Sequence, residues 1–355
     1  MKAFGFLSFG HYAIGNQAGP GAREVLQQAL ELGKAADEIG VNGAYFRVHH
    51  FAPQGASPMP LLGAIAGSTK HIEVGTGVID MRYENPLYLA EEAAALDLLS
   101  DGRVALGVSR GSPEPAERGW ESFGYAAEAP NGADMARNKF ETFLAAIDGY
   151  GVAKAAPEDQ QYPRMYRGGT PLPVFPHSPQ LRRNIWWGAG SHSTAEQAAR
   201  DGVNLMSSTL VSEADGSSLG EMQFEQIRRY RAAWKEAGHD WTPRVSVSRS
   251  VFPIVSERDR QLFGLQGNSQ DQIGSLGEGS PVTFGRSYAA EPDKLIEQLR
   301  ADPAVMAADT LMLTVPNQMG VDVNLSILSN FAEHVAPALG WLPASEGRVE
   351  GYPID

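Results

Sequence analysis

A strand, a helix and a second strand follow one another in residues 72–111, which have the sequence IEVGTGVIDMRYENPLYLAEEAAALDLLSDGRVALGVSRG. The β-branched residues of 72–79 predict the first strand. Pro86 is a residue type that opens helices, and the apolar stretch 87–99 that follows it ends at a Ser-Asp-Gly turn. Residues 103–109 predict the second strand. Neither strand shows a clean alternation of apolar and polar residues, which is typical of strands buried on both faces of a parallel sheet.

The same alternation of strands and helices continues in both directions along the chain. Further strands are expected at residues 2–9, 42–48, 184–189, 203–208, 244–255 and 310–315. Further helices are expected at residues 21–39, 57–68, 135–150, 194–201, 219–237, 295–299 and 323–339. Such an alternation favours an α/β fold, the (β/α)8 TIM barrel. A doubly wound open sheet is the alternative, and it is disfavoured because no GxGxxG motif follows the first strand.

A barrel of this kind takes about 250 residues, whereas the chain has 355. We therefore predict one barrel domain over residues 1–355 that carries insertions near 112–130, 151–183 and 257–290. The second insertion is rich in proline and has little periodicity. The third contains six glycines, so we expect a mobile loop there. These glycines are Gly264, Gly267, Gly274, Gly277, Gly279 and Gly285.

Composition narrows the possible functions. The formal net charge is −13 and there is no run of basic residues, which disfavours binding to nucleic acid. The chain has no cysteine, so disulfides, thiol catalysis and zinc–thiolate sites are excluded. No signal peptide precedes the first strand, and no apolar run reaches the roughly 18 residues of a membrane helix. We therefore expect a cytoplasmic protein without a membrane partner, and any anion must be held locally by arginines and backbone amides.

The active site of such a barrel lies at the C-terminal ends of the strands. After the strand 184–189, Gly190 and Ser191 leave backbone amides free, and Thr194 opens a helix whose N-terminus attracts anions. Ser193 or Thr194 can instead be a plain N-cap of this helix. Arg110 ends the neighbouring strand and favours the anion site, because a guanidinium can bind a phosphate with two hydrogen bonds. The alternative for Arg110 is an ion pair with a surface carboxylate such as Glu114.

Two more features lie on the preceding strands. Thr76 lies between Gly75 and Gly77, which indicates either a flat ring close to the backbone or a bulge that helps the barrel to close. His49 and His50 are adjacent, so on a strand one faces the barrel mouth and the other the helix layer. A histidine in a pocket can bind a cofactor or transfer protons near neutral pH, although a lone histidine is more often structural.

Four segments resemble the luciferase-like flavin monooxygenases. They are RVHHF at 47–51, IEVGTGV at 72–78, NPLYLAEEAAALDLLSDGRVALGVSRG at 85–111 and GAGSHSTAEQAARDG at 188–202. The third segment is the most specific of the four, and the resemblance covers almost the whole chain in the expected order. It implies a TIM barrel that binds a flavin.

The resemblance also implies roles for individual residues. The residues that it places around the cofactor are His49, Thr76, Gly77, Ser109, Arg110, Arg137, Gly190, Ser191 and Thr194. In this family the first histidine lies near the flavin and assists steps that involve its oxygen adduct. Arg110, Arg137 and the 191–194 turn are expected to converge on the flavin phosphate. Thr76 and Gly77 are expected to lie along the flavin ring, and the peptide bond after Gly77 can be cis.

The function that this resemblance implies is that of a two-component monooxygenase. Reduced FMN from a separate flavin reductase and a small organic substrate would act as paired donors, and one atom of molecular oxygen would be incorporated into the substrate. Family members usually pair through the helices at 57–68 and 87–99, so a homodimer or higher homo-oligomer is expected. Light emission is not predicted, because Val48 and Ser109 replace an acidic residue and a cysteine of the luciferases. The alternatives are a hydride-transfer enzyme that uses a deazaflavin, and a non-catalytic flavin-binding protein.

Overall fold

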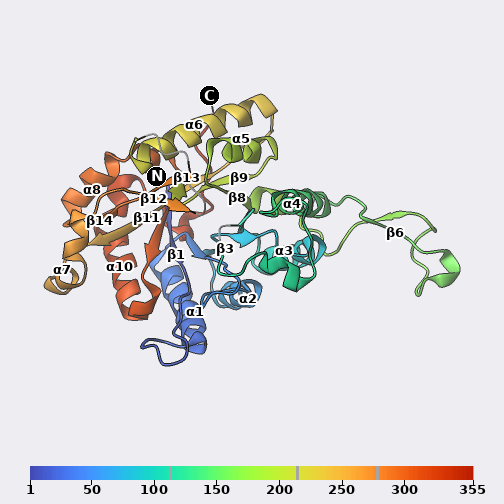
Figure 1. The fold of residues 1–355 in the computed structure, drawn as a ribbon, viewed down its shortest axis with the longest axis horizontal. Helices are drawn as coiled ribbons and strands as arrows, with labels where there is room; N and C mark the ends of the chain where they lie inside the picture. The colour runs from blue at the N-terminus through green and yellow to red at the C-terminus, as the bar shows by residue number, and fades with distance from the viewer. Residues whose placement is uncertain (112–113, 213–215, 277–279, 355) are drawn as a thin grey trace.

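Eight parallel strands form a closed barrel in the computed structural model, which describes residues 1–111, 114–212, 216–276 and 280–354 (Figure 1). They are β1 (Ala3–Ser8), β2 (Gly43–Phe46), β3 (Glu73–Thr76), β5 (Val104–Ser109), β8 (Ile185–Ala189), β9 (Asn204–Ser207), β11 (Val245–Pro253) and β15 (Thr310–Val315). Strand β1 pairs with both β2 and β15. The pairing of β9 with β11, with Leu205 opposite Val245, closes the ring. The predicted (β/α)8 TIM barrel is therefore confirmed, and the open sheet is wrong.

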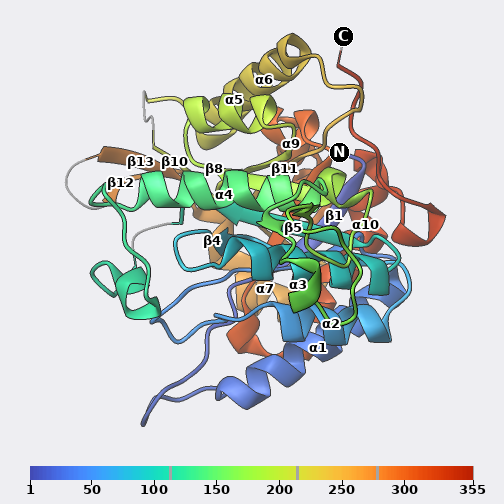
Figure 2. The same ribbon diagram turned by 90° about the vertical axis from the view of Figure 1, so that its right-hand side faces the viewer.

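Helices surround this barrel on its outer side (Figures 1 and 2). They are α1 (Ala22–Ile39), α2 (Met59–Ser68), α3 (Pro86–Leu99), α4 (Ala133–Ile147), α5 (His192–Arg200), α6 (Leu219–Ala237), α8 (Pro292–Arg300), α9 (Pro303–Ala307) and α10 (Val321–His334). Local sequence explains several ends: the Asn85 side chain caps α3, and Gly40 ends α1 with a φ of 94°. Within the ranges that the structure describes, no helix has both the length and the apolar character needed to cross a bilayer.

The strand expected at 72–79 is interrupted. Strand β3 ends at Thr76, and the short strand β4 (Ile79–Asp80) follows after the Gly77-Val78 peptide bond, which is cis. The cis bond that the family resemblance implied at this point is confirmed. Both pieces pair with β5, so the chain keeps its place in the barrel on each side of the break.

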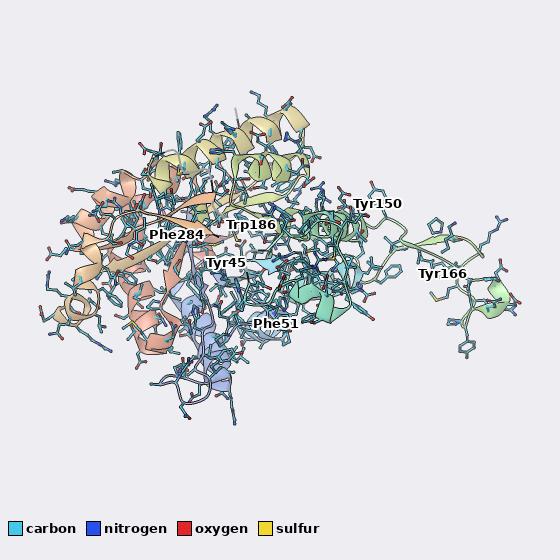
Figure 3. All side chains as sticks on the ribbon, in the orientation of Figure 1. Tyr45, Phe51, Tyr150, Tyr166, Trp186 and Phe284 are labelled. Carbon is cyan, nitrogen blue, oxygen red and sulfur yellow. The ribbon has the colours of Figure 1, made fainter. Side chains whose placement is uncertain are left out.

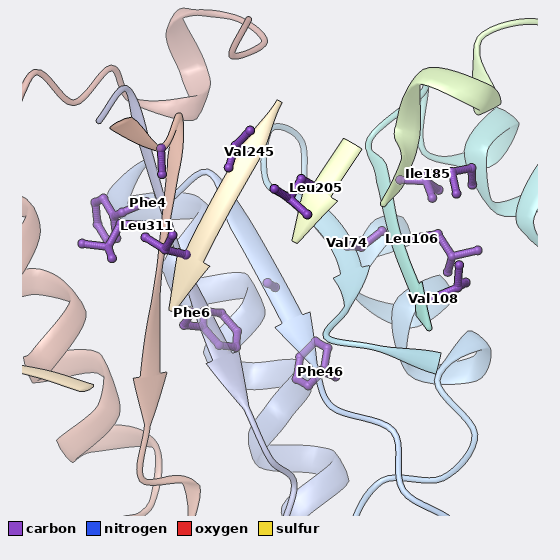
Figure 4. Close-up of a cluster of buried hydrophobic side chains, with 14 of the residues drawn as sticks. Phe4, Phe6, Phe46, Val74, Leu106, Val108, Ile185, Leu205, Val245 and Leu311 are labelled. Atoms are coloured by element: carbon purple, nitrogen blue, oxygen red, sulfur yellow. The ribbon is translucent and has the colours of Figure 1, made fainter. Parts of the chain in front are cut away.

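Side chains on the two faces of the strands form two separate cores. Phe4, Phe6 and Phe46 belong to the larger core (Figure 4). The smaller core consists of the side chains that fill the barrel itself: Leu7, Tyr45, Ala105, Trp186, Met206 and Met312. Burial of both faces explains why the strands lack polar alternation.

An ion pair closes the N-terminal end of the barrel. Arg244 Nη1 lies 2.5 Å from Glu73 Oε1, and the Tyr45 hydroxyl donates to the second oxygen of Glu73 at 3.2 Å. The Arg244 guanidinium also lies 4.9 Å from the centre of the Trp186 ring. These side chains occupy the N-terminal end, whereas active sites of such barrels lie at the opposite end.

The three insertions differ in structure. From residue 114 onward, the first contains a 3-10 helix, η1 (Gly119–Phe123). The second forms a hairpin of β6 (Ala153–Lys154) and β7 (Pro171–Leu172), which projects away from the barrel beyond α3 and α4 (Figure 1).

The third insertion corrects a prediction, because most of 257–290 is regular structure and not one long loop. Its elements are α7 (Glu257–Phe263), η4 (Gly264–Asn268), β12 (Gln272–Leu276), β13 (Ser280–Phe284) and β14 (Ser287–Ala290). Strand β13 pairs with β10 (Leu210–Val211), and β14 pairs with β11. Two of the glycines mark close packing, since a Cβ on Gly267 would lie 2.6 Å from a backbone oxygen and one on Gly285 2.6 Å from Leu219. Gly277 and Gly279 lie outside the described residues.

Close packing inside the barrel predicts the effect of a Gly75→Ala substitution. A Cβ at Gly75 would lie 2.1 Å from the backbone oxygen of Ala105, so β3 and β5 would have to separate. Overpacking of this kind costs about 1–3 kcal/mol of unfolding free energy. Urea unfolding should show a loss in that range. The control is Gly63→Ala in α2, where a Cβ meets nothing within 4 Å and stability should be unchanged or higher by up to about 1 kcal/mol. Equal stability of the two variants would contradict the prediction.

Candidate functional site

Most of the site residues predicted from sequence lie at one end of the barrel. His49, Thr76, Arg110 and Ser191 lie at or just beyond the C-terminal ends of β2, β3, β5 and β8, which are neighbours in the sheet. Strands β5 and β8 are in register with Val108 opposite Trp187. Arg110 and Gly190 therefore follow the ends of two adjacent strands, whose axes are about 4.8 Å apart.

The turn after β8 is a helix cap. Helix α5 begins at His192, two residues before the predicted start, and Ser191 is its N-cap. The Ser191 hydroxyl accepts from the Thr194 amide, and the Thr194 hydroxyl accepts from the Ser191 amide, each at 3.3 Å. A hydroxyl cap at this turn is thus confirmed, but the N-cap is Ser191 and not Ser193 or Thr194, because the helix begins earlier than predicted. A cap does not remove the partial positive charge of the helix N-terminus, so an anion would still be attracted to this end of α5.

Arg110 is exposed and makes no hydrogen bond or ion pair with any residue that the structure describes. The ion pair with Glu114 that we considered for it is absent, because Glu114 turns to other groups. One Glu114 oxygen accepts from the His50 amide at 3.3 Å, and the carboxylate also contributes to raising the pKa of Tyr83. The Arg110 guanidinium thus remains available to an anionic ligand.

Arg137 does not lie at the 191–194 turn. The expectation that it converges with Arg110 and this turn on one phosphate is therefore corrected. Two of its nitrogens bind the two carboxylate oxygens of Asp201 at 2.5 and 2.8 Å, and a third binds Glu141 at 2.7 Å. Asp201 directly follows α5, so it lies at the opposite end of that helix from Ser191, about 15 Å along the axis. Both carboxylates hold the guanidinium there.

Packing inside the barrel accounts for most of the residues that are predicted to lie along the flavin on β3. The Thr76 side chain is fully buried, and its hydroxyl donates to the Gly107 backbone oxygen at 2.7 Å. The close approach of Ala105 accounts for Gly75, which favours the packing alternative at that residue. A Cβ at Gly77 would meet only the flexible Leu7 side chain. Ser109, which is nearly buried, accepts from the Gly111 amide at 2.9 Å.

His49 is held as a neutral ring. Its Nε2 atom lies 2.9 Å from Arg47 Nη2. Because a guanidinium only donates hydrogen bonds, Nε2 accepts, and the proton of the neutral imidazole is on Nδ1. Burial and then the charge of Arg47 lower the pKa of His49 from its usual 6.5 to about 4. At neutral pH His49 is therefore a hydrogen-bonding group and not a cationic acid.

His50 belongs to an aromatic cluster instead of the helix layer, because β2 ends at Phe46 and strand alternation stops there. Its ring stacks on Tyr83 with a centroid distance of 4.1 Å, and Phe123 lies edge-on to it at 5.5 Å. Phe51 and Phe123 contact each other at 6.0 Å and are each about half exposed. This cluster gives the same end of the barrel an accessible apolar surface.

Sequence analysis missed three residues that organise this end. Arg47 sets the charge and tautomer of His49 and also lies 4.7 Å from the Phe9 ring. Asp80 and Arg82 form a buried ion pair at 2.5 Å, and Arg82 donates to the Asn131 backbone oxygen at 3.3 Å, which ties the first insertion to β4. The signal for the pair was its spacing, since an acid and a base two residues apart directly follow a buried strand.

Known proteins resemble this chain both in sequence and in fold. The profile of the luciferase-like monooxygenase family matches residues 1–311. The chain belongs to this family. Curated relatives of the luciferase-like protein include the oxygenase component of flavin-dependent trigonelline monooxygenase from Acinetobacter baylyi, which is 26% identical over 252 residues. They also include the alkanal monooxygenase alpha chain of the Kryptophanaron alfredi symbiont, which is 25% identical over 222 residues.

These two matches cover 69% and 61% of the luciferase-like chain, and 64% and 56% of the respective relatives. The chain thus matches less than two thirds of the length of either relative. Family membership is shown by the family profile, which matches residues 1–311.

Solved structures share the fold over nearly the whole chain. Monooxygenase RslO1 from Streptomyces bottropensis has a TM-score of 0.70 at 20% identity, with 95% of this chain and 99% of that chain covered. The oxygenating constituent of 3,6-diketocamphane monooxygenase from Pseudomonas putida, solved in complex with FMN, scores 0.65 at 16% identity with the same coverage. The coenzyme F420-dependent tetrahydromethanopterin reductase of Methanopyrus kandleri scores 0.60 at 16% identity, covering 94% and 99%. At these identities the likeness shows the fold alone.

The charge of Arg47 predicts a change in the titration of His49. Replacing Arg47 with Met removes a cation and a donor to Nε2, so the pKa of His49 should rise from about 4 toward its usual value. Burial remains, so it should stay below that value. Proton NMR titration of the ring signals measures the shift, and a His49→Gln variant identifies which signal belongs to His49. Arg47→Lys keeps the charge and is the control. Identical pKa values in the Met and Lys variants would show that Arg47 does not set this ionisation.

Proposed function

We propose that this luciferase-like protein is the oxygenase of a two-component monooxygenase that uses reduced FMN. It would act on paired donors and incorporate oxygen from O₂ into a small organic substrate. The observation that carries the proposal is the exposed cation of Arg110, which lacks an ionic partner in the described part of the chain and follows a strand adjacent to the one that leads into α5. A phosphate ester at this point would meet both Arg110 and the N-terminus of α5.

The residues present fit a phosphorylated flavin. Gly190 leaves the adjoining space open, since a Cβ there would meet only the Leu210 backbone oxygen, at 3.9 Å. After β2, at the same end of the barrel, the nearly buried His50 carries an Nε2 atom that has no hydrogen-bond partner among the described residues. An uncompensated buried polar atom is a site at which a ligand can gain a hydrogen bond. Reduced flavin, when bound, supplies the electrons with which molecular oxygen is activated.

The neutral state of His49 suits this chemistry. Four groups that carry or can gain positive charge, Arg47, His50, His11 and Arg82, act on its ionisation together with burial. The imidazole would therefore orient a bound ligand by hydrogen bonding and would not add a further charge. The half-exposed rings of Phe51 and Phe123 offer an apolar surface for an organic substrate at the same end of the barrel.

Partners follow from the same proposal. A curated relative is named as an oxygenase component, which supports a separate flavin reductase for this protein. We infer a homodimer or higher homo-oligomer, supported by the exposed Tyr88, Leu98 and Leu99 side chains of α3. We also infer a cytoplasmic location, where reduced flavin is produced by such reductases.

A hydride-transfer enzyme that uses a deazaflavin is the second candidate. It is favoured by the fold shared with the coenzyme F420-dependent reductase. Both cofactors carry a phosphate beyond the ring, so Arg110 and α5 serve either one. Equilibrium binding of each cofactor in its oxidised and reduced forms separates the candidates, because the monooxygenase proposal requires tight binding of reduced FMN.

Phosphate recognition predicts the effect of an Arg110→Ala substitution. A hydrogen bond to a charged group contributes about 1.5–3 kcal/mol, so affinity for FMN should fall about tenfold or more. Affinity for riboflavin, which lacks the phosphate, should stay the same. Anaerobic fluorescence titration with photoreduced FMN and riboflavin measures both constants. Arg137→Gln is the matched control, because Arg137 is held by Asp201 and should leave FMN binding unchanged. Equal losses for FMN and riboflavin would place the phosphate elsewhere.

The catalytic proposal and a flavin-carrier role differ in one measurable property. In an enzyme, His49→Asn should leave the affinity for reduced FMN within about twofold and change the rate at which oxygen reoxidises the bound flavin, because a neutral donor near the ring has been altered. Stopped-flow mixing of the anaerobic complex with oxygenated buffer gives this rate. A carrier would show the same rate in the parent and the variant, with no oxygenated product from any substrate.

A further inference from the structure

Arg47 is a cation at the mouth of the barrel that has no carboxylate partner. It directly follows β2, it is partly buried, and it forms no ion pair with any acidic residue that the structure describes. Burial lowers the pKa of Arg47, and the charge of Glu114 only partly offsets this effect. A cation that is withdrawn from water without a counter-ion is costly, so the site favours an anionic ligand.

The Arg47 guanidinium lies over a ring that packs on the interior of the barrel. Its central carbon is 4.7 Å from the centre of the Phe9 ring. Phe9 packs in turn on the core that fills the barrel, whose Tyr45 and Trp186 are labelled in Figure 3. Val78, which follows the cis peptide bond, packs on the same core. Arg47 therefore lies near the place that we propose for the flavin ring.

One edge of this guanidinium remains available. Nη2 of Arg47 donates to His49 Nε2 at 2.9 Å, whereas Nε and Nη1 donate to no group of the described residues and are not enclosed by them. Nη2 carries two hydrogens, which belong to two different edges of the planar group. Whichever hydrogen His49 takes, the other one and the N–H beside it form a pair of donors that matches the two oxygens of a carboxylate.

The neighbours of Arg47 add positive charge and do not neutralise it. Burial and four cationic or protonatable groups, Arg47 foremost among them, lower the pKa of His49. Burial and Arg47 also lower the pKa of His11. The carboxylate of Asp80 is already bound to Arg82 at 2.5 Å. This part of the mouth is therefore electropositive, although the whole chain has a formal net charge of −13.

The flavin phosphate does not supply the missing anion. Strands β2, β3, β5 and β8 are successive neighbours, so at about 4.8 Å per strand the ends of β2 and β8 are about 14 Å apart along the ring. Arg110 follows β5 and Ser191 follows β8. The Arg47 side chain turns the other way, to Phe9 after β1. A phosphate that is held by Arg110 and α5 therefore leaves Arg47 to a second anionic group.

We propose that the organic substrate of this protein carries a carboxylate, and that the available edge of the Arg47 guanidinium binds both oxygens of that group. The Phe9 ring, which stacks on His11 with a centroid distance of 5.8 Å, supplies apolar surface beside the bound carboxylate. The substrate then provides the counter-ion that the described part of the chain does not give to Arg47. This inference rests on the proposed function, because it names the substrate class of the same site.

Small carboxylates test the site without any flavin. The probes are acetate, propionate and benzoate, each beside its neutral amide, at pH 7 and constant ionic strength. In protein with nitrogen-labelled arginine, the NMR signal of the Arg47 Nε–H should shift with the carboxylates, and the signal that is missing from Arg47→Met identifies it. Benzoate should bind about tenfold or more tightly than benzamide, because hydrogen bonds to charged groups are the stronger ones. Carboxylates that shift this signal no more than their amides, or a shift that only methanesulfonate or inorganic phosphate produces, would overturn the proposal.

Variants separate a bound carboxylate from a general effect of charge. Arg47→Met should weaken benzoate binding about tenfold or more, to the level of benzamide. Arg47→Lys keeps the charge but loses the planar pair of donors, so its affinity should lie between the two. Arg110→Ala removes a different cation of the same barrel end and is the matched control, which should bind benzoate within about twofold of the parent because a distant charge is screened. Equal losses in Arg47→Met and Arg110→Ala would show that Arg47 does not hold the carboxylate.

Reduced FMN distinguishes a failure of this inference from a failure of the function on which it rests. Arg47→Met should leave the affinity for photoreduced FMN within about twofold, since the phosphate is bound elsewhere. If the variant weakens reduced FMN and leaves oxidised FMN unchanged, Arg47 binds the anionic flavin ring and the substrate assignment is wrong. If the parent binds benzoate through Arg47 but does not bind reduced FMN, the monooxygenase proposal fails and the carboxylate site stands.

Discussion

The pairing of β9 with β11 is the constraint on which the rest of the structure depends. It closes the sheet, and a closed sheet of parallel strands has all its C-terminal ends on one rim. The Glu73–Arg244 pair and Trp186 occupy the opposite end. Close packing between β3 and β5 permits no side chain at Gly75. The ring of strands therefore brings residues that are far apart in the chain to the same end of the barrel, even where their side chains do not touch.

Some arginines near that mouth are paired with carboxylates, and others remain accessible to a ligand. Asp80 neutralises Arg82 in a buried pair, and Asp201 neutralises Arg137 beside the far end of α5. Arg47 hydrogen-bonds to His49 and helps to hold it neutral. Arg110 keeps its charge exposed at the rim. An anionic group that approaches the rim beside α5 thus meets one accessible guanidinium and one helix N-terminus, which is the arrangement that we propose for the flavin phosphate.

The three insertions are attached to the barrel in different ways. The first is tied to the barrel through Arg82 and supplies Phe123 to the aromatic cluster at the mouth. The second leaves the barrel altogether and carries exposed aromatic and basic side chains. The third is built into the sheet system through β13 and β14. Long insertions are tolerated in a barrel because they leave from loops and do not interrupt the strands and helices that form its core.

The sequence by itself determined the order of the strands and helices, the family and the position of Arg110, because periodicity, caps and strand ends are local properties of a few consecutive residues. It also indicated the cis bond after Gly77 through the resemblance. The tertiary structure alone decided that Arg137 is held by Asp201, 64 residues away, that Ala105 excludes a side chain at Gly75, and that 257–290 forms a helix and a hairpin. Those outcomes depend on which distant residues become neighbours, and the free energy of such contacts is set by packing and charge in three dimensions.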